Sequence, residues 1–402
     1  MKSKEKNNRN LKTFKFAIKP NKKQEEYLYD CCRASQLVKN EYIFLAEADN
    51  EEEKKPNFTA YNRNITRWRT YGEGFEDRYL DEEGNNWGIE LLRKCPSRDL
   101  NHIANQLRGN FFTKGGGSRL KPKPLRLANS FQTDSYKLEI NEDKLKKSHI
   151  FLSNPASRKK PHKVKLIMHR SLDGREPKIA TIKHQAGKWY VCIVGESQTL
   201  PKKIKIKKTI GLDFGIKEHV TDNKGNTFHI PTYKDIEARQ ARLNQKMALC
   251  KKGSKNFRKI KSKIARLKHY EANKKKHARH AISRQIVSEN DGIAVEDFEV
   301  KKIVEKTEED KKILRRVKKA INKKLVSGGV AEIISQIQYK SELEGKTCKM
   351  VDPKYTSMTC SCCGFINRNL TLDEREWDCP ECGTHLFRDP NAAEVVRQRA
   401  FG

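Results

Sequence analysis

Apolar and polar residues alternate near the start of the chain, and this period of two predicts a strand over residues 11–20. Its apolar side chains, from Phe14 to Ile18, fall on one face of that strand. Asn21 followed by Gln24 fits a capping box, so the apolar stripe that continues through YLYDCCRASQLVKNEYIFLAEA predicts a helix. The chain is therefore expected to open with one strand and one helix.

A polar, helix-compatible region continues to about Phe112, where the run TKGGGSRLKPKP (113–124) predicts a linker or an exposed basic loop. From about 130 to 198 the period returns to two. VKLIMHR, KIATIKH and KWYVCIV are typical of strands, and the last two are expected to pair as a hairpin across 185–187. The expected product is a small β-barrel or sheet, which the strand at 11–20 is a candidate to join.

The second half of the chain alternates strands with helices. TIGLDFG, IAVEDF and TCKMVD are typical of short buried strands, so this half is expected to form an α/β domain. The helix predicted between the first two strands is unusually basic, because Arg239 to Arg284 holds seventeen Lys and Arg but one acid, Glu271. An apolar stripe from Phe257 to Leu267 steps by three and four residues, so one face packs and the rest stays basic.

The net charge indicates the class of partner. The chain has 85 Lys and Arg against 51 acids, a formal charge of +34. Such a surface favours a polyanion, and nucleic acid is expected ahead of an anionic membrane. We expect the basic helix to contact phosphates without reading sequence, although a solvated helix face is the plainer alternative. The residues expected to bind nucleic acid are Lys251, Lys252, Lys255, Arg258, Lys259, Lys274, Lys275 and Lys276.

No apolar run approaches the ~20 residues of a membrane span. The first residues, MKSKEKNNRN, also lack the apolar segment of a signal peptide. We therefore expect a cytoplasmic protein without a membrane partner. In that compartment the eleven cysteines are expected to be thiols or metal ligands.

Three acids lie in settings that suggest chemistry. Asp213 and Glu296 each occur within a short apolar strand, where a carboxylate is costly unless a cation or hydrogen bonds satisfy it. Alternation places Glu296 and Asp297 on opposite faces, so on pattern alone either could be the ligand. Asp389 begins a helical turn in RDPNAAEVV, and Pro390 suits the first turn. The alternative is three unrelated surface or capping acids.

Two strand acids and one helix acid form the layout of ribonuclease-H-like nucleases. In that layout carboxylates hold two divalent ions about 4 Å apart, one activating water and the other stabilising the leaving oxygen. Magnesium or manganese suits such an all-oxygen site.

The cysteines near the end of the chain have zinc-ribbon spacing. Two CxxC pairs are separated by 15 residues, and four thiolates leave no open position for catalysis, so the zinc is expected to be structural. Cys362 is an extra thiol spaced too closely to Cys360, and His385 is interpreted as a surface residue. The predicted ligands are Cys360, Cys363, Cys379 and Cys382. The cysteines interpreted as packing residues are Cys31, Cys32, Cys95, Cys192, Cys250 and Cys348.

With these residues in hand, the chain resembles TnpB, the RNA-guided nuclease family encoded by insertion-sequence transposons, and the related miniature type V CRISPR effectors. The resemblance rests on GLDFGIK, KKGSKNFRKIKSKIARLKHYEANKKKHARHAI, IAVEDF and VDPKYTSMTCSCCG…CPECG…RDPNAA, in the family's order over roughly 205–400. FKFAIKPNKKQEEYL also matches, whereas 50–125 match only vaguely. The chain departs from the family at Met358 and in LVSGGVAEI at 325–333.

The resemblance implies a RuvC-type nuclease whose metal-binding acids are Asp213, Glu296 and Asp389, which favours Glu296 over Asp297. It implies an α/β plus β fold, in which an RNase-H-like RuvC domain with a zinc-ribbon insert follows a β-barrel wedge domain holding a helical recognition domain. The implied bounds are 1–20 and 125–204 for the wedge, 21–124 for the recognition domain, 205–350 and 386–402 for the nuclease, and 351–385 for the target-nucleic-acid-binding ribbon.

The implied function is an RNA-guided DNA endonuclease in a prokaryotic, nucleoid-associated setting. A guide RNA would find double-stranded target DNA beside a short flanking motif, and one site holding Mg²⁺ or Mn²⁺ would cut both strands, with Zn²⁺ in the ribbon. The alternatives are a guided DNA-binding regulator that does not cleave, or a miniature type V CRISPR effector. A transposase that joins DNA itself is disfavoured, because no recombinase nucleophile occurs in a recognisable setting.

Overall fold

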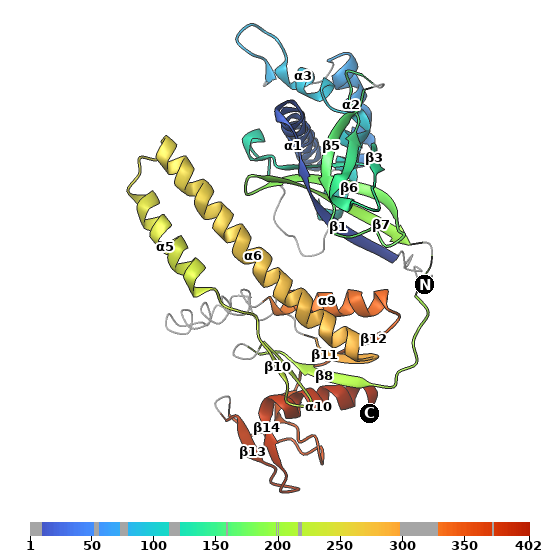
Figure 1. The fold of residues 1–402 in the computed structure, drawn as a ribbon, viewed down its shortest axis with the longest axis vertical. Coiled ribbons are helices and arrows are strands. Elements are labelled where there is room, and N and C mark those ends of the chain that lie inside the picture. The colour runs from blue at the N-terminus through green and yellow to red at the C-terminus, as the bar shows by residue number, and fades with distance from the viewer. Residues whose placement is uncertain are drawn as a thin grey trace. The chain divides into compact units, whose positions relative to one another are not determined.

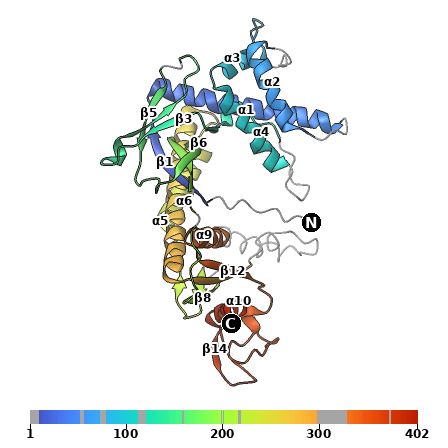
Figure 2. The ribbon, with the colours of Figure 1, turned by 90° about the vertical axis from the view of Figure 1, so that its right-hand side faces the viewer.

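The structure, a computed structural model, describes residues 10–51, 56–72, 79–111, 121–157, 160–197, 199, 201–215, 219–297, 329–371 and 374–402. The chain divides into two compact units, Met1–Thr199 and Leu200–Gly402, which Figures 1 and 2 show from two sides. None of the described helices is both long and apolar enough to cross a membrane. Two predicted segments lie partly outside these residues, namely 113–120 of the basic linker and 325–328 of the second departure from the family.

The N-terminal unit opens with the predicted strand and helix. Phe14 and Ile18 of β1 (Asn10–Lys19) are buried on one face, as predicted. The capping box forms before α1 (Lys22–Glu51), because the Asn21 and Gln24 side chains each accept a hydrogen bond from the other's backbone N–H at 2.9 Å. In the described part of the helix-compatible region beyond it lie α2 (Phe58–Thr70), α3 (Trp87–Arg93) and α4 (Ser97–Phe111).

Seven antiparallel strands form the sheet of this unit, in the order β2-β6-β7-β1-β5-β4-β3. The strand β1 lies between β7 and β5, so the predicted addition of the first strand is confirmed. The predicted hairpin is also confirmed, with Ala186 and Gly187 at φ 53° and 80° in its turn. The remaining strands are β2 (Ser130–Thr133), β3 (Tyr136–Glu139), β4 (Ser148–Leu152), β5 (His162–Ile167), β6 (Glu176–Gln185) and β7 (Lys188–Ser197).

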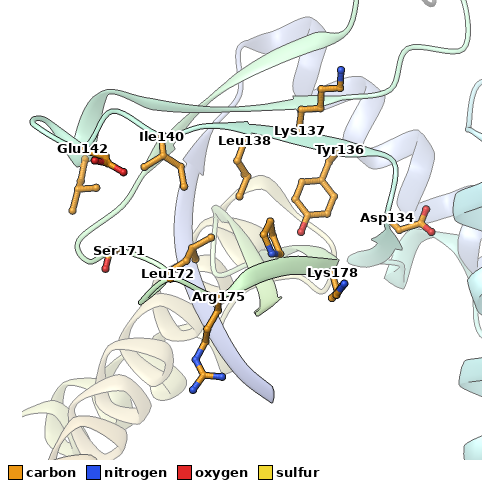
Figure 3. A pocket seen from close by; sticks show the side chains of 13 residues that line it. Asp134, Tyr136, Lys137, Leu138, Ile140, Glu142, Ser171, Leu172, Arg175 and Lys178 are labelled. Carbon is orange, nitrogen blue, oxygen red and sulfur yellow. The ribbon is translucent and has the colours of Figure 1, made fainter. Parts of the chain in front are cut away.

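The two edge strands of this sheet, β2 and β3, are consecutive in sequence. A flat sheet of seven strands would separate its edges by about 29 Å. The link from Thr133 to Tyr136, however, has three Cα steps and spans at most about 11 Å. The sheet must therefore curl until its edges approach each other. Beside this corner lies a cavity of about 860 Å³, into which Figure 3 shows Tyr136 and Leu138 pointing from β3 toward the loop that carries Leu172.

The C-terminal unit contains a five-stranded sheet in the order β10-β9-β8-β11-β12. The three strands β8 (Thr209–Asp213), β11 (Gly292–Glu296) and β12 (Thr347–Val351) are parallel. The other two, β9 (Val220–Asp222) and β10 (Thr227–Phe228), are antiparallel. Among the described residues of this unit, the helices are α5 (Lys234–Ala248), α6 (Lys255–Glu289), α9 (Val330–Leu343) and α10 (Arg388–Phe401). The predicted strands and the α/β character of this half are confirmed.

The basic segment forms two helices rather than the single helix that its sequence predicted. Gly253 adopts φ 85° in the link between α5 and α6, a conformation that ends a helix. Ser254 then caps α6 by accepting a hydrogen bond from the Phe257 N–H at 3.1 Å. The segment therefore folds back as a helical hairpin (Figure 1).

The two faces of the C-terminal sheet carry different helices (Figure 1). Leu212 and Val295 point to one face and belong to the apolar core that includes buried side chains of α6 and α9. The opposite face carries Gly211 and Ala294, against which α10 packs. A Cβ atom on Gly211 would lie 1.9 Å from the Ala393 carbonyl oxygen, so the absence of a side chain allows α10 to approach β8 closely.

We predict that Gly211→Ala destabilises the C-terminal unit by about 3 kcal/mol or more, at the upper end of overpacking effects, because backbone atoms of α10 cannot yield. Gly292→Ala is the matched control in the neighbouring strand. There the three atoms nearest to the added methyl group would belong to the side chains of Ile206, Phe401 and Thr209, at 3.0–3.1 Å, and side chains can shift by a few tenths of an ångström. Urea unfolding of both variants measures the difference, and equal losses would contradict the close contact at Gly211.

Candidate functional site

Three acidic side chains are directed to the α10 face of the C-terminal sheet. Asp213 follows Gly211 by two residues on β8, and Glu296 follows Ala294 by two residues on β11, so both acids share the face on which α10 packs. The strands are parallel neighbours, and the two acids lie at their carboxyl ends. Asp389 lies in the first turn of α10. The structure therefore brings together the three acids that the sequence singled out.

Asp297 occupies a different environment. It is exposed and follows the last residue of β11, and its backbone N–H donates to the Val351 carbonyl oxygen at 2.8 Å. Of the two candidate acids in IAVEDF, Glu296 is the one buried on the α10 face.

The electrostatics of this site favour the binding of a cation. Burial, followed by the charges of Glu296 and Asp389, raises the pKa of Asp213 to about 8. Burial also raises the pKa of Glu296, although the Thr356 hydroxyl donates a hydrogen bond to its Oε1 at 2.5 Å and opposes that rise. A bound cation relieves the repulsion between carboxylates that lie so close together.

The donors of this site fit hard divalent cations, because carboxylate oxygens are the ligands that Mg²⁺ and Mn²⁺ prefer. Among the described residues, the cysteine group is the one set of three or more His, Cys, Asp or Glu side chains whose ligand atoms all lie within 4.8 Å of one another.

Asp389 is held by contacts that sequence reasoning did not identify. Arg375, just before β13 (Glu376–Asp378), places its Nη1 3.2 and 3.4 Å from the two carboxylate oxygens. Asn391 is buried and accepts a hydrogen bond from the Ser361 N–H at 2.9 Å, while its amide donates to the Thr359 carbonyl at 2.7 Å. The Asn in RDPNAA was a possible signal, because a buried amide needs partners.

Four cysteines form the second candidate site. The Sγ atoms of Cys360 and Cys382 lie 3.7 Å apart, and those of Cys363 and Cys379 lie 3.6 Å apart. A tetrahedral zinc with Zn–S bonds of about 2.3 Å requires S···S separations of about 3.8 Å, so the four thiols fit that ion. Cys362 is exposed and is not a member of the group, which leaves the predicted set unchanged.

Both halves of the cysteine group use the same turn. Gly364 and Gly383 adopt φ 80° and 68°, and their N–H groups donate to the Cys360 and Cys379 carbonyls at 2.9 and 2.8 Å. The second half is carried by β13 and β14 (His385–Phe387), whose Trp377 and Leu386 form a small core with the buried cysteines. The predicted surface residue His385 is exposed and hydrogen-bonds Asp378 at 2.7 Å.

The predicted nucleic-acid-binding residues lie on the helical hairpin, and most are exposed. At its tip, within the described part of the chain, no acidic partner appears for Lys251, Lys252, Lys255, Arg258 and Lys259. Lys274 is exposed, with its Nζ 4.8 Å from the centre of the Tyr233 ring and 5.1 Å from that of Tyr270. Lys276 is also exposed.

Lys275 differs from its neighbours. Its Nζ lies 2.6 Å from the Glu271 carboxylate, and both side chains are largely buried. Glu271 also accepts a hydrogen bond from the Gln240 amide of α5 at 2.8 Å. Glu271 therefore links α6 to α5, and it balances the charge of Lys275.

The remaining cysteines take no part in either site. Cys31, Cys32 and Cys95 are buried in the core of the N-terminal unit, in agreement with their interpretation as packing residues. Cys192, Cys250 and Cys348 are half-buried.

Two family models match the C-terminal half of the chain in sequence. The family described as "Probable transposase" matches residues 190–307, which include β8, the basic hairpin and β11. The family described as "Cas12f1-like, TNB domain" matches residues 331–396, which include the four cysteines and Asp389.

Similar proteins extend the match toward the N-terminus. An Escherichia coli K12 protein, InsQ, whose name proposes an RNA-guided DNA endonuclease, is 24% identical over 404 residues, covering 96% of this chain and 91% of that protein. A Streptomyces pristinaespiralis protein whose name proposes the same activity is 28% identical over 227 residues, covering 56% of this chain and 53% of its own length.

Among solved structures, Cas12f1 in a complex with a single guide RNA and target DNA has a similar fold. Its TM-score is 0.50 at 13% sequence identity, and the alignment covers 97% of this chain and 99% of that one. Both family models are thus matched in chain order, and one relative aligns over nearly its whole length. The chain is therefore similar in sequence to the families described as "Probable transposase" and "Cas12f1-like, TNB domain".

Proposed function

We propose that this protein is an RNA-guided DNA endonuclease that cuts both strands of a double-stranded DNA target in one metal-dependent site. The proposal is carried by the convergence of Asp213, Glu296 and Asp389 on one face of a parallel sheet. The names of the relatives from Escherichia coli and Streptomyces pristinaespiralis support the same activity. Guide pairing would read the target sequence, and the protein would read a short flanking motif.

The three acids would hold Mg²⁺ or Mn²⁺. When bound, two such ions activate water and stabilise the leaving oxygen of the phosphodiester. The fold positions the three acids. Asp213 and Glu296 stand on hydrogen-bonded strands, the Thr356 hydroxyl orients Glu296, and the first turn of α10 presents Asp389. Arg375 balances the charge of Asp389 from the side of the cysteine group.

The proposed domain bounds follow the order of elements along the chain. A wedge β-barrel would comprise 1–20 and 125–204, a proposal supported by the curled sheet, whose edge strands are joined by two residues. The recognition domain, 21–124, would comprise the helices inserted between β1 and β2. The RuvC-like domain would comprise 205–350 and 386–402, with the zinc ribbon, 351–385, inserted before Asp389.

The zinc ribbon is proposed to guide a nucleic-acid strand toward the three acids. Zinc would supply no chemistry to the reaction, because four thiolates fill its coordination shell. The zinc ion would hold two turns of the chain in a fixed conformation, and in that conformation the backbones of Ser361 and Thr359 hydrogen-bond to Asn391. That contact lies two residues from Asp389, so the ribbon and the acid would be positioned together.

A CRISPR effector is the second candidate, because a Cas12f1 is among the solved structures with a similar fold. The RNA that copurifies with the protein separates the two: a guide carrying transposon-end sequence indicates the transposon form, and one carrying a CRISPR repeat indicates the effector. A guided regulator without cleavage is disfavoured, because all three acids are present.

We predict that alanine at Asp213, Glu296 or Asp389 lowers guided cleavage of both DNA strands by at least about a thousandfold, because the metal ions lose a ligand. Guided binding should survive, since base pairing and basic contacts hold the target. Asp297→Ala is the matched control and should retain activity. Cleavage and binding are measured side by side for the four variants. Normal cleavage by Asp213→Ala, or its loss in Asp297→Ala alone, would show that the site is misassigned.

We predict that Cys379→Ser or Cys382→Ser releases about one zinc ion per chain and loosens the C-terminal unit, because the thiolates supply the local fold. Cys362→Ser, in the same turn as Cys360 and Cys363, should retain zinc. A colorimetric chelator assay on denatured protein counts the metal, and limited proteolysis reports the loosening. Zinc loss from Cys362→Ser, or full cleavage by zinc-free protein, would contradict the assignment.

Nucleic-acid binding should be strongly electrostatic. Replacing Lys251, Lys252 and Lys255 with Gln should flatten the dependence of log K on log salt by up to ~0.7 per lost contact on single strands and ~0.9 on duplex. Lys275→Gln is the control, because Glu271 already balances that charge, and it should loosen the α5–α6 contact instead. Fluorescence anisotropy across a salt series measures both slopes. An equal change of slope in the control would place the phosphate contacts elsewhere.

A further inference from the structure

One side-chain amide bridges strand β8 and helix α10 in the part of the unit that carries the three acids. Asn223 directly follows β9, and its Oδ1 accepts a hydrogen bond from the Gly211 N–H at 3.3 Å. Its Nδ2 donates to Glu394 Oε2 on α10 at 2.9 Å. Chemistry fixes this orientation of the amide, because a backbone N–H only donates and an ionised carboxylate only accepts.

The carboxylate of Glu394 is the centre of a larger polar network. Arg397 donates to its oxygens at 2.5–3.1 Å, and Gln398 donates to it at 3.2 Å. The contacts with Arg397 do most to lower the pKa of Glu394, so the carboxylate is ionised. Arg397 also reaches the Thr209 hydroxyl of β8 at 3.4 Å, and Gln398 donates to the Ser361 carbonyl of the cysteine turn at 2.9 Å. The network therefore joins β8, α10 and the cysteine group.

The hydrogen bonds of this network supply an attraction that the packing at Gly211 lacks. A Cβ there would lie 1.9 Å from the Ala393 carbonyl oxygen and 2.8 Å from the Arg397 backbone nitrogen. Backbone atoms in such close contact set the shortest distance between helix and strand, but each pair of atoms attracts only weakly. Hydrogen bonds to ionised groups are stronger and directional. We therefore expect the Asn223 bridge to fix both the distance of α10 from β8 and its rotation.

Two of the three acids depend on that placement. Asp213 lies two residues beyond Gly211 on β8, and Asp389 precedes Glu394 on α10. A rotation or displacement of α10 would move the Asp389 carboxylate relative to that of Asp213 while both elements stayed folded. Metal ligands need such external support, because small errors in their position weaken binding.

We propose that Asn223 is a positioning residue of the candidate metal site. Through Glu394 it holds α10 at the distance and rotation from β8 at which Asp213 and Asp389 bind the same metal ions. The inference rests on the proposed function for the identity of that site. It gives Asn223 no part in the chemistry, since its amide is fully engaged by Gly211 and Glu394.

Loss of the bridge should weaken metal binding. Asn223→Asp keeps an acceptor for the Gly211 N–H, but it removes the donor and places a second negative charge beside Glu394. We expect its affinity for Mn²⁺ to fall about tenfold or more, as is usual when a group that orients a metal ligand is lost. The EPR signal of free Mn²⁺ measures binding to the zinc-loaded, full-length protein without nucleic acid, so the measurement does not depend on cleavage.

A buried substitution on the other face of the sheet is the matched control for stability. Ile337→Val removes one methyl group from α9, in the core that α9 shares with α6. It should lower the urea midpoint of unfolding and leave the Mn²⁺ affinity unchanged. If Ile337→Val reduces the Mn²⁺ affinity as much as Asn223→Asp does, the role of Asn223 is only structural and the proposal is overturned.

Reversal of the hydrogen bond tests the bridge itself. In Asn223→Asp/Glu394→Gln the acceptor lies beside β8 and the donor lies on α10, so the bond can form again in the opposite direction. We expect the double variant to recover most of the Mn²⁺ affinity that Asn223→Asp loses, because residues in direct contact are energetically coupled. An affinity no better than that of Asn223→Asp would overturn the proposal.

Asp213→Ala separates a failure of this inference from a failure of the proposed function. Mn²⁺ binding by Asp213→Ala equal to that of the parent protein would show that the three acids are not the metal site, and both proposals would fall. Loss of Mn²⁺ binding in Asp213→Ala, together with the parent affinity in Asn223→Asp, would overturn the positioning role alone.

Discussion

The close approach of α10 to β8 is the constraint on which the candidate nuclease site depends. At Gly211 the backbone of the helix takes the place of a side chain, with a carbonyl oxygen 1.9 Å from where a Cβ would stand. Asp213 is two residues along the same strand, and Asp389 is one turn from Ala393 on the same helix. A wider spacing between α10 and β8 would move the carboxylates of Asp213 and Asp389 apart, although the sequence would be the same. Packing therefore creates the electrostatic repulsion that a cation would relieve.

Much of this arrangement could be predicted from the sequence, because its signals are local. The capping box at Asn21 and Gln24, the hairpin turn before Lys188 and the four cysteines each depend on residues close together in the chain. The burial of Asp213 and Glu296 could also be predicted, since the apolar residues around each acid are its neighbours in sequence.

Other features could not be predicted, because partners distant in the chain decide them. The central place of β1 depends on pairing with β7 and β5, more than a hundred residues away. Lys275 has the same local sequence character as Lys274 and Lys276, but it pairs with Glu271 one helical turn earlier, and the carboxylate of Glu271 is held by Gln240 across the hairpin. The break at Gly253 was visible as a glycine, yet the surrounding helical pattern outweighed it. Arg375 and Thr356 gained their roles entirely from tertiary contacts.

The Asn391 side chain has a consequence for how the C-terminal unit can change during evolution. It accepts a hydrogen bond from the Ser361 N–H of the cysteine turn and donates one to the Thr359 carbonyl. An acidic residue at this position would lose the donated hydrogen bond, and an apolar residue would lose both. A single amide thus joins the cysteine turn to the helix that carries Asp389. Recombination that imported a foreign ribbon would have to bring a matching α10 with it, and lineages should exchange the two together.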